Sequence, residues 1–94
     1  IGYIDNSSDG DTILGNVHKY FCDIGSGSVA IFLPDPTLSA GEIVLFYVRS
    51  IAGDGHLSMN GNIDGNGLNT MDVTNLTNMF QFMSDGQTWR SFLF

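Results

Sequence analysis

Short apolar stretches separated by turn residues recur along the whole chain. The stretches are rich in Val, Ile, Phe and Tyr, which favour strands, and Gly, Asn, Asp and Ser lie between them. The one window with helix-like spacing, 73–83, contains Asn and Thr residues and a Met-Phe-Gln-Phe-Met run that suits a strand better. We therefore expect strands at about 17–24, 29–33, 42–52, 56–63, 68–73, 78–84 and 88–94.

About seven short strands in 94 residues predict an all-β fold, a small antiparallel sandwich or barrel-like domain. Gly25-Ser26-Gly27-Ser28 predicts a hairpin between the first two strands, and Asp85-Gly86 predicts another before the last strand. We expect residues 17–94 to form the module and the turn-rich residues 1–16 to form a lead-in arm. Because the chain opens without an initiator Met, we expect a processed product or a fragment.

Two of the expected strands carry more apolar surface than a thin domain covers alone. The run from Ile43 to Val48 is apolar on both faces, so each face needs cover from another layer or another subunit. The terminal run from Trp89 to Phe94 has the same need. In contrast, 56–63 alternates polar and apolar residues and predicts an outer strand. We expect a homo-oligomer, with interface residues Val44, Phe46, Val48, Phe80, Phe82, Phe92 and Phe94.

Charge and cysteine content remove several function classes. The formal net charge is -7, and Lys19, Arg49 and Arg90 are the only Lys or Arg residues, so we expect no nucleic-acid partner. The longest apolar run is far shorter than the roughly 20 residues that span a bilayer, so we expect no membrane helix. Cys22 is the single cysteine, which excludes an intrachain disulfide, and two His residues do not readily complete a zinc site with it. We expect no cofactor and no metal.

From residue 29 onward the chain resembles a module common in bacteriophage tail-fibre and tail-tip proteins. The resemblance is carried by five pieces in order: Leu33-Pro34, Ala40-Gly41, Gly53-Asp54-Gly55, Ile63-Asp64-Gly65 and Ser84-Asp85-Gly86-Gln87-Thr88-Trp89. It implies a β-rich virion component, often trimeric, in a tail fibre, a spike or a head-surface fibre. The chain departs from the family in the Met-rich and Phe-rich segment 79–83, which indicates an interface there.

Candidate sites for chemistry are weak in this sequence, and we expect no enzyme. His18 and His56 lack a Ser, Asp or Cys partner at a spacing that indicates catalysis. A glycosidase-like carboxylate pair, drawn from Asp5, Asp9, Asp11, Asp54 and Asp64, would need a sugar-binding surface shared across subunits. The oxygen-rich run Asn60, Asn62, Asp64, Gly65 and Asn69 lacks the closing carboxylate of a calcium loop, because Met71 stands at that position, so a polar turn is favoured.

Aromatic side chains give the remaining ligand candidates. Tyr3, Tyr20, Tyr47 and Trp89 would stack on sugar rings if they lined a cleft, although Trp89 after a tight turn favours core packing.

Three functions follow from these observations. The first is a trimeric structural module of a virion, in a tail appendage or on the capsid surface, with contacts to other virion proteins and to a host receptor. The second is a capsid decoration protein that stabilises the shell. The third is a carbohydrate-binding module for host-surface glycans.

Overall fold

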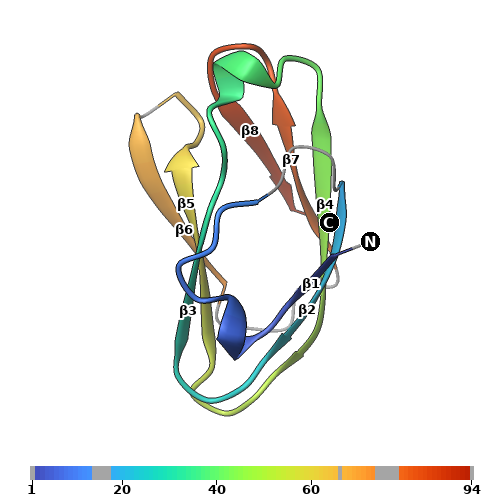
Figure 1. Ribbon diagram of the computed structural model, residues 1–94, viewed down its shortest axis with the longest axis vertical. Helices are drawn as coiled ribbons and strands as arrows, with labels where there is room; N and C mark the ends of the chain where they lie inside the picture. The colour runs from blue at the N-terminus through green and yellow to red at the C-terminus, as the bar shows by residue number, and fades with distance from the viewer. Residues whose placement is uncertain (1, 14–17, 66, 74–78, 94) are drawn as a thin grey trace.

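The computed structural model describes residues 2–13, 18–65, 67–73 and 79–93. Within these ranges, eight strands form two facing sheets (Figure 1). Sheet A has the order β1-β2-β4-β7-β8, and sheet B has the order β3-β5-β6. The strands are β1 (Gly2–Ile4), β2 (Lys19–Ile24), β3 (Ser28–Phe32), β4 (Ile43–Ile51), β5 (His56–Asn62), β6 (Leu68–Val73), β7 (Phe80–Ser84) and β8 (Trp89–Leu93), with short 3-10 helices η1 (Asn6–Ser8) and η2 (Pro36–Leu38).

This architecture confirms the all-β, sandwich-like prediction and refines it. Each expected strand matches an observed strand to within two residues over the described positions, and β1 is an addition. The sheets are mixed, not antiparallel as expected, because β1, β2 and β4 run parallel, as do β3 and β5. In the part of the chain that the structure describes, the two sheets do not close into a barrel.

The parallel pairs arise from three stacked arches, each of which begins in sheet A, turns a corner and continues along sheet B. Arch 1 is residues 2–13, arch 2 is residues 19–32 and arch 3 is residues 43–62. Arch 1 reaches sheet B through a parallel bridge between Thr12 and Phe32. The hairpin expected at 25–28 is therefore wrong. That turn carries the chain from β2 in one sheet to β3 in the other. These two strands pair with β4 and β5 of arch 3 and not with each other.

Antiparallel strands complete the sandwich beyond arch 3. β6 pairs with β5, β7 pairs with β4, and β8 pairs with β7. The turn predicted at Asp85-Gly86 is confirmed as the β7–β8 hairpin, which begins after the Ser84–Trp89 pair. The Asp85 carboxylate accepts hydrogen bonds from the backbone N–H groups of Gln87 and Thr88, both at 2.9 Å.

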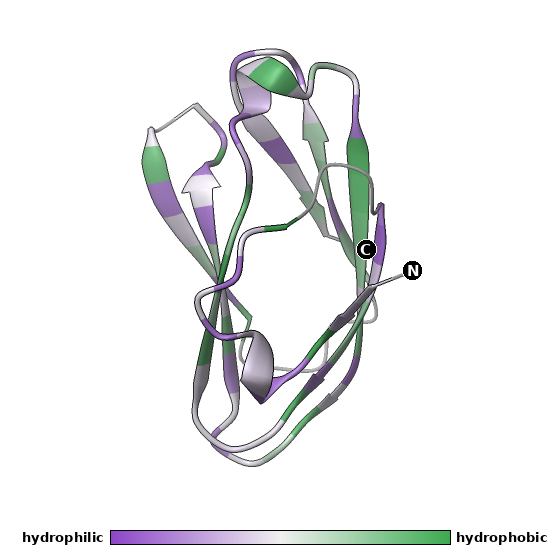
Figure 2. Cartoon of the chain, viewed as in Figure 1, coloured by the Kyte–Doolittle hydropathy of each residue, from purple (hydrophilic) through white to green (hydrophobic). Residues whose placement is uncertain are grey.

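The core lies between the sheets and is built from alternate residues of each strand. Figure 2 shows β4 as an almost continuous hydrophobic strand in its first part, and its inward half supplies the centre of the core. The Phe46 ring stacks on Phe80 with ring centroids 5.0 Å apart and meets Phe82 edge-on at 5.9 Å. The described part of the expected lead-in arm, residues 2–13, adds Ile4 and Ile13 to this core.

Candidate interaction surface

A row of aromatic side chains crosses the outer face of sheet A. Tyr3, Phe21 and Tyr47 occupy equivalent positions in the three arches, because Tyr3 is paired with Phe21 and Phe21 with Tyr47. The ring centroids are 6.0 Å apart in both neighbouring pairs. Tyr3 is 65% exposed and Tyr47 is 42% exposed. The parallel stacking of arches thus places rings from distant parts of the sequence side by side on the surface.

Two further rows continue this surface toward β8. Leu45 is paired with Lys19 on one side and with Gln81 on the other, and Gln81 is paired with Phe92. Ile43 is paired with Met83, and Met83 with Arg90. Ile43 and Phe92 are each 43% exposed. A shallow apolar groove of about 230 Å³ lies between the rows, lined by Lys19, Tyr20, Phe21, Leu45, Tyr47 and Met79. We call these outward residues of β1, β2, β4, β7 and β8 the aromatic face.

All three cationic residues of the sequence lie on the aromatic face. Arg49 pairs with the Asp23 carboxylate through two nitrogens, and its guanidinium lies 4.7 Å from the Phe21 ring centroid. The hydrogen bond from Arg49 lowers the pKa of Asp23 below its usual value. Arg90 donates to Asp85 at 2.9 Å, and Lys19 lies beside the groove.

Most carboxylates lie away from the aromatic face. Only Asp23, Glu42 and Asp85 border it, and the other seven of the ten carboxylates belong to arch 1, the turns and sheet B. The molecule therefore has one apolar, cation-bearing face and an acidic remainder.

The structure places most of the expected interface residues inside the chain's own core. Val44, Phe46, Val48, Phe80 and Phe82 are at most 3% exposed, and sheet B covers them. A partner does not reach these side chains, because they lie on the inward faces of β4 and β7. The other apolar face of β4 is directed outward. Phe92 does lie on the aromatic face, while Phe94 lies outside the described residues.

The aromatic ligand candidates lie in three different environments. Trp89 is fully buried, and its indole N–H donates to the Pro34 carbonyl at 2.8 Å. Tyr20 is half-buried and stacks on Phe46 at 5.3 Å, so its ring belongs to the core side of β2. Tyr3 and Tyr47 present their rings to solvent on the aromatic face.

The sequence analysis missed Phe21 and Leu45 as surface residues, and it considered Tyr47 only as a candidate for stacking on sugar rings. The alternation within β4 carried part of that signal, since odd-numbered residues from 43 to 47 face opposite to Val44 and Phe46. The alignment of β1, β2 and β4 was not visible, because parallel pairing joins residues that are far apart in the sequence.

The outer face of sheet B holds a polar cluster that the sequence analysis also missed. The His56 Nε2 atom lies 2.9 Å from the Asp72 carboxylate, and its Nδ1 atom lies 3.5 Å from the Ser28 hydroxyl. These residues come from β5, β6 and β3, so the imidazole ties the three strands together. His18 lies 3.7 Å from Glu42 across an exposed surface.

The oxygen-rich residues that suggested a calcium loop are engaged in hydrogen bonds. Asn60 accepts from Thr70 at 2.7 Å, Asn62 donates to the Gln87 carbonyl at 3.0 Å, and Asp64 accepts from the Ser91 hydroxyl at 2.6 Å. Among the described residues, no group of three His, Cys, Asp or Glu side chains is placed to hold a metal ion.

Comparisons with protein families, with curated proteins and with solved structures found no match to this chain. Across the described ranges, no helix is both long enough and apolar enough to span a bilayer.

Proposed function

We propose that this chain is a structural module of a virion appendage, a homotrimer whose subunits associate through the aromatic face. The observation that carries the proposal is the continuity of that face. Aromatic and aliphatic side chains of five strands form one exposed surface, with Tyr3, Ile43, Tyr47 and Phe92 each more than two-fifths exposed. A contiguous apolar surface of this kind marks a site of association in a water-soluble protein.

The chemistry of the face favours a protein partner over a glycan. Tyr, Phe and Arg are enriched at the energetic centres of protein interfaces. A sugar-stacking platform needs open ring faces, whereas the Phe21 ring meets Tyr47 edge-on at 83° and its own face is covered by Arg49. The surface is therefore better suited to bury against side chains than to stack on sugar rings.

Charge favours a contact between two different surfaces of neighbouring copies. At a net charge of -7, two copies repel each other unless an interface brings opposite charges together. On the aromatic face the three cations balance the three bordering carboxylates, so this face meets the carboxylate-bearing surface of another copy with less repulsion than two acidic surfaces would have. An interface between unlike surfaces closes into a ring when the rotation permits, and a trimer is one such ring.

The placement in a virion is supported by the ordered turns that resemble the phage tail-fibre module. Two of these turns have clear architectural roles. The 53–55 turn joins β4 to β5 at the corner of arch 3, and the 84–89 segment forms the β7–β8 hairpin. A rigid β-sandwich with one exposed apolar face for association is suited to serve as a building block of a fibre or spike.

The test is the mass of the purified chain in solution by light scattering. We expect three times 10.2 kDa for the wild type, and a mass near 10.2 kDa for the double variant Tyr47→Asp/Phe92→Asp. Burying an unpaired carboxylate in the interface opposes association. Tyr47→Phe/Phe92→Leu is the matched control, because it changes the same two positions but keeps them apolar, and it should leave the mass unchanged.

Circular dichroism must show that the double variant keeps the fold. A wild-type chain that stays monomeric at high concentration, or a folded double variant that stays trimeric, overturns the proposal.

A further inference from the structure

The outer edges of sheet A, at β8 and at β1, differ in how far the chain's own hydrogen bonds cover them. At the β8 end, the chain protects its own sheet edge: the backbone N–H of Asp64 donates to the Trp89 carbonyl at 2.8 Å, and the Asp64 carboxylate accepts from the Ser91 N–H at 3.1 Å. Ile63 also forms a parallel bridge to Trp89. Covering an edge in this way prevents another chain from adding a strand there.

The β1 end lacks such cover in the part of the chain that the structure describes. β1 is the outermost strand of sheet A, and its described pairing is with β2 alone. Residues 10–13 are the outermost part of sheet B, where Gly10 and Ile13 donate to β3 carbonyls and Asp11 accepts from Phe32. Since a strand has backbone donors and acceptors along both edges, the far edge of β1 is a template for a further strand.

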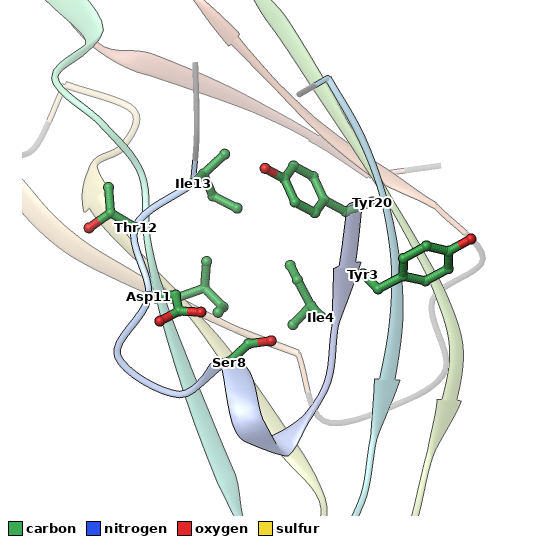
Figure 3. Close-up of a pocket in the computed structure, with 8 residues that line it drawn as sticks. Tyr3, Ile4, Ser8, Asp11, Thr12, Ile13 and Tyr20 are labelled. Atoms are coloured by element: carbon green, nitrogen blue, oxygen red, sulfur yellow. The ribbon is translucent and has the colours of Figure 1, made fainter. Parts of the chain in front are cut away.

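Between these two outer segments lies a cavity of about 140 Å³ that opens at the same end. Figure 3 shows Ile4, Ile13 and Tyr20 directed toward one another across it, while Tyr3 points away on the opposite side of β1. Ser8, Asp11 and Thr12 also line the cavity and make it polar toward arch 1. An apolar side chain that entered it would contact the aliphatic groups of Ile4 and Ile13.

The register of the arches shows where a new strand would place its side chains. Inward residues of neighbouring strands lie next to one another, as in the row Ile4, Cys22 and Val48. A strand added beside β1 would place its inward residue next to Ile4, at the mouth of the cavity. Its outward residue would lie beside Tyr3 and extend the aromatic row.

The charge of arch 1 selects among the chains that could add such a strand. Arch 1 contains Asp5, Asp9 and Asp11, and residues 2–13 contain no Lys or Arg. Two copies that met through this end would bring like charges together at the edge, which opposes that dimer. A strand with Lys or Arg residues next to its apolar ones has the complementary charge.

We propose that the β1 end of the sandwich binds an extended basic segment of another protein by strand addition. The segment pairs with the outer edge of β1, places an aliphatic side chain in the cavity beside Ile4, and directs its cations toward the carboxylates of arch 1. This proposal does not depend on the contact between copies proposed above, which the β1 site adjoins at Tyr3.

The test uses a fluorescent peptide that alternates lysine and valine, added to the full chain and followed by anisotropy. We expect saturable binding of this peptide and none of the matched peptide that alternates glutamate and valine. The same lysine peptide with every amide N-methylated should also fail to bind, because neither of its edges then offers N–H donors to the edge of β1. Amide chemical shifts should change in β1 and in residues 10–13.

Charge reversal at the cavity provides the matched variants. Asp11→Lys should weaken binding of the lysine peptide about tenfold, as expected for reversing one close charge. Glu42→Lys makes the same change before β4 and should leave binding unchanged. Binding that survives N-methylation, shift changes confined to β4, β7 and β8, or no binding of the lysine peptide overturns the proposal. The solution mass of the chain reports separately on the contact between copies.

Discussion

The indole Nε1–H of Trp89 donates a hydrogen bond of 2.8 Å to the carbonyl oxygen of Pro34, which lies 55 positions earlier in the chain. Trp89 begins β8 in sheet A, whereas Pro34 follows β3 in sheet B. One fully buried side chain thus joins the two sheets and satisfies a backbone acceptor between them. This contact explains why Trp89 belongs to the core and is not available as a platform for ligands.

We expect Trp89→Phe to lower the free energy of unfolding by about 2–4 kcal/mol. The variant leaves the Pro34 carbonyl without its donor and also creates a void where the larger ring was. Urea denaturation followed by circular dichroism measures the change. Phe92→Leu is the control, because Phe92 is half-exposed on the aromatic face. This change should lower the free energy of unfolding by less than about 1 kcal/mol. Equal losses in the two variants would contradict the assignment.

The positions of the strands were accessible from the sequence because each depends on local information. Period-two alternation and turn residues lie within a few positions of one another, and they located β2 to β8. The Asp85 turn was predictable for the same reason, since its carboxylate bonds its own backbone two and three residues on. β1 was missed because three residues are too few to show alternation.

The pairing of the strands was not accessible, because parallel partners are separated by a whole arch. Tyr3 meets Phe21 and Phe21 meets Tyr47 only after two corners have carried the chain across and back. The sequence analysis recognised that β4 is apolar on both faces but named Val44, Phe46 and Val48 for the interface, and these side chains are buried in the chain's own core. The buried face belongs to the core, and the partner proposed here binds the other.

The Asp85 carboxylate should make stability depend on pH in the acid range. Hydrogen bonds from the backbone of Thr88 and Gln87, and then from Arg90, lower the pKa of Asp85 in the folded chain. Its contribution is therefore complete above the unfolded pKa of about 3.9 and disappears as the pH falls through the lower folded pKa.

We expect Asp85→Ala to be clearly less stable than the wild type at pH 7, and the difference to shrink steadily below about pH 4. Thermal unfolding across this pH range provides the measurement. A difference that stays constant down to pH 2 would show that the loss comes from the backbone turn alone and not from the charge.

The Cys22 thiol should be unreactive in the folded protein. Burial raises its pKa to about 12, and the nearby Asp23 carboxylate adds to the effect, so the reactive thiolate is scarce at neutral pH. We expect little alkylation by iodoacetamide in buffer and complete alkylation in denaturant, as measured by mass spectrometry. Because the pKa is higher in the folded state, stability should also fall as the pH rises above the ordinary thiol value of 9.0. Rapid alkylation of the native chain would contradict this burial.

The corner of arch 3, which packs against the corner of arch 2, provides a matched pair of glycine substitutions. A Cβ atom on Gly55 would lie 2.6 Å from the Gly25 carbonyl oxygen and 2.7 Å from that of Ala52, whereas a Cβ atom on Gly53 meets nothing within 4 Å. Both glycines lie in the same turn between β4 and β5, so their effects on the unfolded chain are similar.

We expect Gly55→Ala to destabilise the fold by about 1–3 kcal/mol and Gly53→Ala to change it by less than about 0.5 kcal/mol. The clash at Gly55 involves the Ala52 carbonyl oxygen of its own turn and the Gly25 carbonyl oxygen of the neighbouring corner, and the second atom moves only if the two arches separate. Urea denaturation of both variants measures these changes in the free energy of unfolding. If Gly55→Ala proved as stable as Gly53→Ala, the corners would not be stacked as closely as the parallel arches require.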